Sequence, residues 1–297
     1  MQRMVTQVQV PVEALLLDYD GTISPLHVPR AESHVPAQTQ AALKCISRRI
    51  PVVVVTSKAP DFVIPRTPFA TAWSTINGLE TRIGESVFSA SFSNLQLEMV
   101  SAAVKYAKAR LAAVDVDIEE KRLSSQQVVG FCVDWRRSKD SAKAKRAADR
   151  VARRLRALQL YVCGFEGDPF YDVYSVPAHK GRAVEAIRER LGLKSGVAFM
   201  GDSEMDNPAF LLSDISLGVL HEDSQPRLCV DYRTPFEDLA YSLQLNLGPP
   251  VSHKASRPRL CCDYWMRFED VADFLGELWK NGLVFNSGFS SLKSFGE

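Results

Sequence analysis

The chain has 297 residues, 46% apolar and 24% charged, a composition typical of globular proteins with a large buried core. Its 36 basic and 35 acidic residues nearly cancel, so net charge favours neither nucleic acid nor an anionic membrane as a partner. No apolar run approaches the roughly 20 residues that span a bilayer, and we expect a cytoplasmic protein.

Five apolar runs predict strands of a parallel sheet that is covered on both faces. Each run is rich in β-branched or aliphatic residues and is followed by a helical pattern. The runs are residues 13–18 (EALLLD), 51–56 (PVVVVT), 71–76 (TAWSTI), 196–201 (GVAFMG) and 215–219 (ISLGV). The predicted fold class is therefore α/β, with a Rossmann-like parallel sheet as its core.

Residues 86–176 have a different pattern, which predicts an inserted α+β module. A helix is predicted from the spacing of Leu97, Val100, Val104, Ala107 and Leu111, and a second helix from Ala144, Ala148, Val151, Leu155 and Leu158. Between them, the alternation of Val129, Phe131, Val133 and Trp135 predicts a strand with one buried face. The core would then comprise residues 1–85 and 177–297.

The C-terminal part contains an internal repeat. Residues 219–243 and 251–275 align without gaps and share PRLC, DY and FED. Two copies are too few for a solenoid, so we interpret residues 219–275 as a duplicated strand–helix unit at the edge of the core sheet. We assign it no chemistry.

Two acidic clusters directly follow predicted strands, where open α/β sheets bind ligands. The first is DYDGT, with Asp18 at the end of a strand, Asp20 in the turn, and Gly21 and Thr22 after it. Two carboxylates held in this way can divide the work of nucleophile or metal ligand and of general acid and base. Alternatively, the stretch is an ordinary acidic turn.

The second cluster is GDSEMDN, with Asp202, Asp206 and Asn207 after Gly201. Together with Asp18 and Asp20, these aspartates offer the hard oxygen ligands that Mg²⁺ prefers, although Asp202 also suits a helix N-cap. Thr56 can offer a phosphate a hydroxyl and a backbone N–H, and Lys180 can offer an ammonium at the start of a helix.

The order of these four sequence features, the two acidic clusters with Thr56 and Lys180 between them, resembles that of the haloacid-dehalogenase-like superfamily over almost the whole chain. DYDGT is similar to its first motif, Thr56 to the second, Lys180 to the third and GDSEMD to the fourth. The superfamily uses aspartyl-phosphate chemistry, and an Asp two residues after the nucleophile marks its phosphatases and phosphomutases.

The resemblance implies a role for each matched residue. Asp18 would attack phosphorus, and Asp20 would act as general acid and base and lend its carbonyl to Mg²⁺. Asp202 and Asp206 would hold or orient the metal site. Thr56, the adjacent Ser57, and Lys180 would bind the phosphoryl group.

The inserted module resembles the cap of sugar-phosphate phosphatases, and its pattern is similar to the trehalose-6-phosphate phosphatase family. The matching substrate positions are Glu119, Glu120, Lys121, Ser125, Trp135 and Arg136. Such groups could hydrogen-bond sugar hydroxyls, although a solvated charge cluster is the alternative for Glu119, Glu120 and Lys121. This resemblance implies hydrolysis of trehalose 6-phosphate.

The chain departs from that family at three places. Tyr174 and Val176 occupy the region where the family carries a Glu, and Thr56-Ser57-Lys58 replaces Ser-Gly-Arg. In the fourth motif, Asp202-Ser203 replaces Asp-Asp and Met205-Asp206 replaces Thr-Asp. The alternatives are a sucrose-phosphate phosphatase, a glucosyl- or mannosyl-3-phosphoglycerate phosphatase, a phosphohexomutase, and a non-catalytic sugar-phosphate-binding module.

The basic helix over 139–156 lacks interleaved aromatic residues, so we interpret its charged side as a solvated face rather than a nucleic-acid site. The oligomeric state stays open.

Overall fold

The computed structural model describes residues 9–26, 28–165, 168–221, 227–228, 259–260 and 262–294. The chain divides into two compact units. Among the described residues, the core unit comprises residues 9–88, 179–228 and 259–294, and the cap unit comprises residues 89–178. In the part of the chain that is described, no helix is long and apolar enough to cross a membrane.

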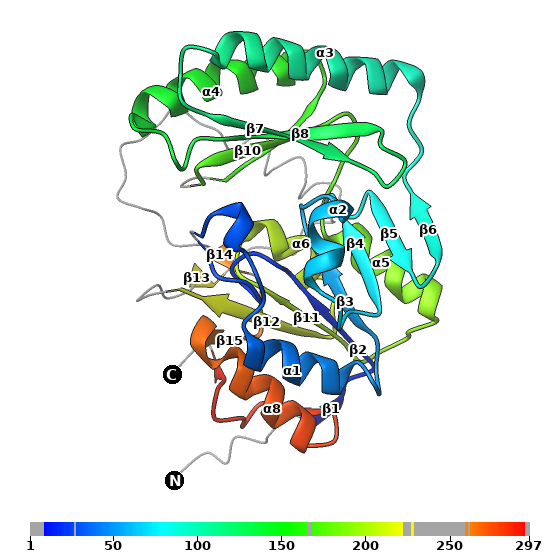
Figure 1. Ribbon diagram of the computed structural model, residues 1–297. Helices are drawn as coiled ribbons and strands as arrows, with labels where there is room; N and C mark the ends of the chain where they lie inside the picture. The colour runs from blue at the N-terminus through cyan, green and yellow to red at the C-terminus, as the bar shows by residue number, and fades with distance from the viewer. Residues whose placement is uncertain are drawn as a thin grey trace. The chain divides into compact units, whose positions relative to one another are not determined.

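The core unit is built on a nine-stranded sheet in the order β17-β15-β12-β11-β2-β3-β4-β5-β6 (Figure 1). The strands from β15 to β4 are mutually parallel, whereas β17 and β5 pair antiparallel with them. Their bounds are β2 Ala14–Leu17, β3 Val52–Val55, β4 Ala72–Thr75, β5 Glu80–Ile83, β6 Ser86–Ser89, β11 Val197–Gly201, β12 Ile215–Leu220, β15 Tyr264–Arg267 and β17 Lys293–Ser294. The five predicted runs form β2, β3, β4, β11 and β12, which confirms the predicted fold class.

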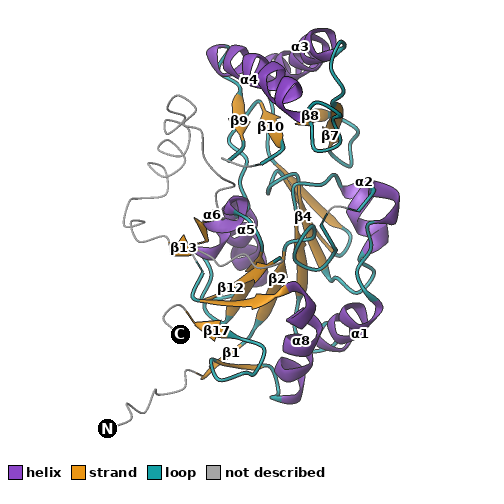
Figure 2. Ribbon diagram, turned by 90° about the vertical axis from the view of Figure 1, so that its left-hand side faces the viewer, coloured by secondary structure: helices purple, strands orange, loops and turns teal. Residues whose placement is uncertain are grey.

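Helices cover both faces of this sheet (Figure 2). On one face α1 (Ala37–Ile46) and α8 (Val271–Lys280) pack on Leu15, Leu17 and their neighbours. On the other face α5 (Gly181–Leu191) and α6 (Asn207–Phe210) pack on Ala14, Leu16 and their neighbours. Successive strand residues thus enter opposite cores, which is why these strands are apolar without alternation.

Short elements complete the core unit. They are β1 (Gln9–Pro11), which pairs with β16 (Val284–Asn286), the helix α2 (Pro60–Val63), and four 3₁₀ turns, η1 (Arg30–Glu32), η2 (Ile64–Arg66), η3 (Glu204–Asp206) and η4 (Phe268–Asp270).

The cap unit is a four-stranded antiparallel sheet with two helices on one face. The strand order is β7-β8-β10-β9, with β7 Asp117–Arg122, β8 Val128–Asp134, β9 Tyr161–Cys163 and β10 Phe170–Tyr174. The helices are α3 (Asn94–Leu111) and α4 (Ser141–Ala157). The predicted apolar stripes are buried, with the exception of Leu158, which follows the end of α4 and is 45% exposed.

The two copies of the C-terminal repeat meet in a short parallel pair. Arg227 and Leu228 in β13 pair with Arg259 and Leu260 in β14, which are the equivalent positions of the second copy. The second copy then continues as β15 and α8, a strand–helix unit at the sheet edge. The counterpart in the first copy, residues 229–250, lies outside the described residues.

Candidate active site

The predicted core residues gather at one edge of the core sheet. Leu17 of β2 pairs in parallel with Val54 of β3 and with Met200 of β11, so these three strands end side by side. Asp18, Thr56 and Asp202 are the residues directly after these strands. The sheet topology therefore places their side chains at the carboxyl edge, where α/β sheets bind ligands.

Lys180, immediately before α5, is the centre of the site. Its Nζ lies 2.8 Å from Oδ1 of Asp18 and 2.6 Å from Oδ1 of Asp206, and all three residues are buried. Burial by itself would lower the pKa of Lys180, but the two carboxylates outweigh burial and raise it. Lys180 is thus a permanently charged group that holds the first and fourth motifs together.

Both carboxylate oxygens of Asp206 accept hydrogen bonds from neighbouring residues of the site. Oδ1 accepts from Lys180, while Oδ2 accepts from the backbone N–H groups of Asp202 and Ser203 and from the Ser203 hydroxyl. The second oxygen of Asp18 and the Asp202 carboxylate are less constrained. The Asp202 carboxylate is therefore the first candidate for direct metal ligation, with Asp206 orienting the loop, whereas the second oxygen of Asp18 is available to a bound ligand.

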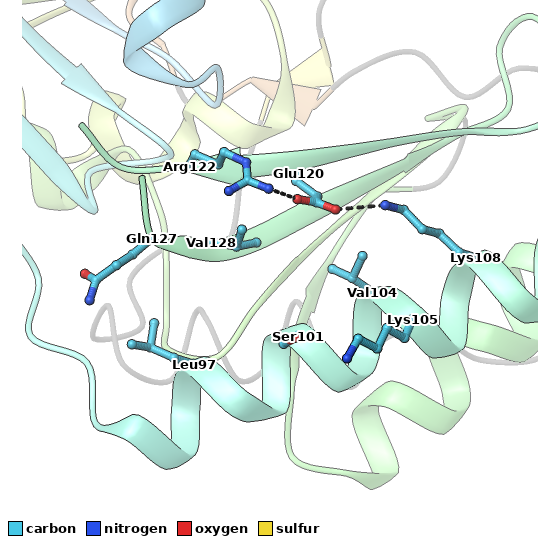
Figure 3. Close-up of a pocket in the computed structure, with 9 residues that line it drawn as sticks. All are labelled: Leu97, Ser101, Val104, Lys105, Lys108, Glu120, Arg122, Gln127 and Val128. Atoms are coloured by element: carbon cyan, nitrogen blue, oxygen red, sulfur yellow. Dashed lines mark hydrogen bonds and ion pairs between the residues drawn. The ribbon is translucent and has the colours of Figure 1, made fainter. Parts of the chain in front are cut away.

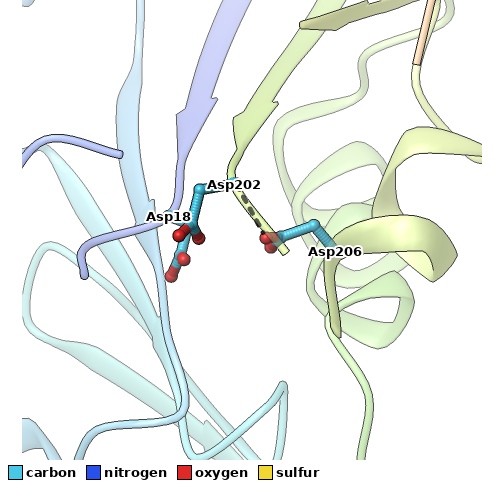
Figure 4. A group of neighbouring side chains, drawn as sticks. All are labelled: Asp18, Asp202 and Asp206. Carbon is cyan, nitrogen blue, oxygen red and sulfur yellow. Dashed lines mark hydrogen bonds between the residues drawn. The ribbon is translucent and has the colours of Figure 1, made fainter. Parts of the chain in front are cut away.

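The acidic group fits a divalent cation. Ligand oxygens of Asp18, Asp202 and Asp206 lie within 4.8 Å of one another, and Figure 4 shows the first two carboxylates side by side. Three carboxylates face one ammonium, which leaves two uncompensated negative charges when all are ionised. Hard oxygen donors at this spacing suit Mg²⁺, and the added charge would stabilise the ionised forms.

Without that cation, Asp18 and Asp202 have raised pKa values. Burial raises the pKa of Asp18 to about 7; the charge on Lys180 opposes the rise and the Asp206 carboxylate adds to it. The pKa of Asp202 is raised well above its usual value, first by burial and then by the carboxylates of Asp18 and Asp206. A bound cation would lower the pKa of both groups, because its positive charge stabilises their carboxylate forms.

The turn after Asp18 is held tightly. Gly21 has φ +75°, and a Cβ there would lie 2.0 Å from Oδ2 of Asp202. Only glycine allows this contact between the first and fourth motifs. Asp20 projects from the same turn, and its Oδ2 lies 3.3 Å from Nζ of Lys58.

Thr56 is buried at the end of β3. Its Oγ1 accepts a hydrogen bond from the backbone N–H of Lys58 at 3.1 Å, which leaves the hydroxyl proton to be donated elsewhere. Its carbonyl accepts from the N–H of Asn77. Ser57, the other predicted phosphate contact, is half-buried.

Sequence reasoning missed three contributors to this edge. Lys58 pairs with Asp20, and Ile76, Asn77 and Gly78 form a left-handed turn after β4 with φ of +53°, +52° and +84°. The Asn-Gly dipeptide is the signal that could have predicted this turn. The third, His221, donates from Nε2 to the carbonyl of Gly21 at 2.6 Å.

His221 connects the first motif to the C-terminal repeat. Nε2 must carry a proton because the Gly21 carbonyl can only accept, and the same nitrogen lies 3.9 Å from Oδ2 of Asp202. The ring stacks on Phe268 at 5.1 Å. His179 instead accepts from the N–H of Arg182 through Nδ1; burial, followed by the Arg182 charge, lowers its pKa to about 4 and keeps it neutral.

In the cap unit, Glu119 and Lys121 lie on the sheet face away from the helices, in a polar cluster. Nζ of Lys121 is 3.6 Å from Oε1 of Glu119 and 4.0 Å from Oδ1 of Asp172. The Tyr174 hydroxyl donates to Oδ2 of Asp172 at 3.1 Å. Sequence reasoning missed Asp172, although the period of two on β10 places it on the face of Tyr174.

Gly130 on β8 makes room for this cluster. The strand registers align Glu119, Cys132 and Asp172 in one row and Lys121, Gly130 and Tyr174 in the next. A Cβ at Gly130 would lie 2.4 Å from Cδ1 of Tyr174. The Tyr174 ring can therefore lie over Gly130, on the same face of the sheet, and extend toward Lys121.

The other predicted cap residues lie elsewhere in the cap unit. Glu120 projects toward α3, where it binds Lys108 and Arg122 (Figure 3). Trp135, predicted to contact the sugar, is buried in the apolar core against Tyr171, because it continues the alternation of Phe131 and Val133. Ser125 is exposed in the β7–β8 turn, and Arg136 pairs with Asp134 at 2.8 Å. These four residues do not join the Glu119–Lys121 cluster.

Comparisons with known proteins agree with this architecture. No family model and no curated protein matches the sequence. Among solved structures, the C-terminal domain of trehalose-6-phosphate phosphatase from C. albicans is similar, with TM-score 0.62 and 15% identity over 90% of this chain and 92% of that one. A trehalose-6-phosphate phosphatase related protein gives TM-score 0.60 and 14% identity, covering 91% and 98%.

A sugar phosphatase of haloacid-dehalogenase subclass IIB is also similar, with TM-score 0.57 and 14% identity over 92% of this chain and all of that chain. At such identities the likeness establishes the fold. The chain has the haloacid-dehalogenase-like phosphatase fold, as its motifs predicted. These three structures each cover 90–92% of this chain, so the likeness extends over both units.

Replacing Gly21 by Ala should destabilise the protein more than replacing Gly84, which also has positive φ (+57°) but has nothing within 4 Å of the position that an added methyl group would occupy. Both variants carry the backbone penalty of about 1 kcal/mol, but only Gly21→Ala pushes against Asp202. Urea unfolding measures both changes. Equal losses of unfolding free energy would contradict the close contact between the two motifs.

The metal-free protein should lose stability as pH rises from about 4 to about 7. The folded-state pKa of Asp18 lies above the unfolded value, so in this window the folded protein retains a proton that the unfolded chain has released. Urea unfolding in EDTA should show the decline, and Asp18→Asn should flatten it. Mg²⁺ should stabilise more at pH 8 than at pH 5. A pH dependence identical in wild type and Asp18→Asn would contradict the assignment.

Proposed function

We propose that this protein is a Mg²⁺-dependent phosphatase that hydrolyses a sugar phosphate monoester through an aspartyl-phosphate intermediate, with trehalose 6-phosphate as the first candidate substrate. The observation that carries the proposal is the buried Asp18 carboxylate, held through one oxygen by Lys180 beside Asp202. This arrangement leaves the second oxygen of Asp18 as the nucleophile at the ligand-binding edge of the sheet.

In the first step, an Asp18 oxygen forms a bond to phosphorus while the bond from phosphorus to the sugar oxygen breaks. Asp20 gives its proton to that sugar oxygen. In the second step, water attacks phosphorus, Asp20 takes the proton from the water, and the Asp18–phosphorus bond breaks to release phosphate. Lys58, 3.3 Å from Asp20, stabilises the carboxylate that Asp20 becomes between the two steps.

Thr56 and Lys180 would meet the phosphoryl oxygens, Thr56 through its hydroxyl proton and Lys180 through its ammonium, with Ser57 beside them. Asp18, Asp202 and the backbone carbonyl of Asp20 would hold Mg²⁺, with Asp206 orienting that site. When bound, Mg²⁺ supplies positive charge that neutralises the phosphoryl group.

The cap unit would select the leaving group through the Glu119–Lys121 cluster. Lys121 lies 3.6 Å from Glu119 and 4.0 Å from Asp172, so this face of the cap sheet gathers a cation and two carboxylates that sugar hydroxyls would hydrogen-bond. A set of charged donors and acceptors that includes the buried Lys121 and Asp172 favours a polyhydroxyl ligand and rejects esters that lack those hydroxyls. The similarity to trehalose-6-phosphate phosphatase structures supports trehalose 6-phosphate within this class.

Phosphate release should be measured on trehalose 6-phosphate, sucrose 6-phosphate, glucose 6-phosphate and glucosyl 3-phosphoglycerate, with Mg²⁺ or EDTA. We expect Mg²⁺-dependent turnover that favours trehalose 6-phosphate and falls about 1000-fold or more in Asp18→Asn, because the nucleophile is lost. Turnover favouring another ester would overturn the substrate assignment. Binding without release would support the non-catalytic module, and turnover that persists in Asp18→Asn would overturn the mechanism.

Lys121→Met should raise KM for the preferred sugar phosphate at least tenfold while leaving hydrolysis of 4-nitrophenyl phosphate nearly unchanged, because that ester has no sugar to recognise. Tyr174→Phe, which removes only a hydroxyl, should act in the same direction more weakly. Lys139→Met, at an exposed position of the same unit, is the matched control. Equal losses of activity on the sugar phosphate and on 4-nitrophenyl phosphate would show that Lys121 does not recognise the sugar.

A further inference from the structure

A hollow of about 410 Å³ lies between α3 and the strands β7 and β8, entirely within the cap unit (Figure 3). Ligand pockets in proteins typically enclose about 300–1,000 Å³. The residues that line the hollow are Leu97, Ser101, Val104, Lys105, Lys108, Glu120, Arg122, Gln127 and Val128. It is therefore large enough for a small organic molecule.

Two charged residues of β7 face the helices and line the hollow. Ile118 packs on the apolar core of the cap, and the period of two puts Glu120 on the same side of β7. A register shift between Lys121 and Arg122 pairs Arg122 with Val128, so both line the hollow as well. Such irregularities re-aim side chains and are common beside binding sites.

The lining is rich in positive charge. Three cations, Lys105, Lys108 and Arg122, accompany one anion, Glu120. Nζ of Lys108 lies 2.8 Å from Oε1 of Glu120, and Arg122 binds the other oxygen. The hydrogen bond from Lys108 lowers the pKa of Glu120, so the carboxylate stays ionised and fixes these two cations in place. Lys105, one helical turn before Lys108, adds a further positive charge.

Neutral groups complete the lining. Ser101, one turn before Lys105, offers a hydroxyl, and Ser125 donates to Oε1 of Gln127 at 3.3 Å, which leaves the Gln127 amide nitrogen to donate. Leu97, Val104 and Val128 provide apolar wall. The hollow thus combines several N–H and O–H donors with an apolar surface, a combination that matches an anion carrying an apolar body.

We propose that this hollow binds a small organic anion, a phosphonate, phosphate or carboxylate attached to an apolar group. The anionic head lies against Lys105, Lys108 and Arg122, and the apolar body lies on Leu97, Val104 and Val128. All of these residues belong to the cap unit, so the proposal goes beyond the phosphatase function and holds whether or not that function is correct.

Isothermal titration with phenylphosphonate tests the proposal, because its carbon–phosphorus bond cannot be hydrolysed as an ester. EDTA is included so that binding at the acidic site of the core unit is suppressed. We expect one site with Kd of about 1 mM or tighter. Lys105→Glu should weaken binding about tenfold or more by reversing a charge at the hollow. Benzyl alcohol, which lacks the anion, should bind far more weakly.

Two further variants separate the hollow from general charge effects. Ser101→Phe fills the hollow and keeps every charge, and it should also abolish binding. Lys143→Glu, at an exposed position of α4, makes the same charge change outside the hollow and should bind as wild type does. Absence of binding to wild type, equal weakening by Lys143→Glu, or unchanged binding in folded Ser101→Phe would each overturn the proposal.

Discussion

The buried ammonium of Lys180 is the interaction on which the core site depends. It joins the end of β2, through Asp18, to the 3₁₀ turn after β11, through Asp206, and it lies where α5 begins. Each carboxylate is tolerable in the apolar edge of the sheet because this cation is present, and the cation is tolerable because both carboxylates are. The remaining negative charge, which Lys180 does not neutralise, is what would attract a divalent metal ion to the site.

The framework of this site was predictable from local sequence, but its internal connections were not. Strands buried on both faces produce continuous apolar runs, and the chemistry follows each run directly, so Asp18, Thr56 and Asp202 could be named in advance. The contact of His221 with Gly21 joins residues 200 positions apart through a single hydrogen bond. No periodicity encodes such a contact, which depends on how β12 and the turn after β2 are placed in the sheet.

The cap unit shows a different limit. Consecutive residues of a strand face opposite sides, so on β7 Glu120 faces away from Glu119 and Lys121, which share one face. The same alternation that correctly predicted β8 also places Trp135 in the apolar core with Phe131 and Val133. Family resemblance grouped the cap residues by chain position, whereas strand geometry keeps Glu119 with Lys121, removes Glu120 and Trp135 from that group, and adds Asp172 and Tyr174 from β10.

The pairing of β2 with β11 also determines the order in which the protein can assemble on the ribosome. The helices and strands of the cap unit are consecutive in residues 89–178, so its contacts can form as soon as that segment has emerged. The core sheet must wait, because β2 needs β11 as a neighbour and β12 needs β15, and both partners follow the cap unit in the sequence. Until then the apolar edge of β2 lacks one partner, and this interval of synthesis is when the nascent chain is most exposed to aggregation.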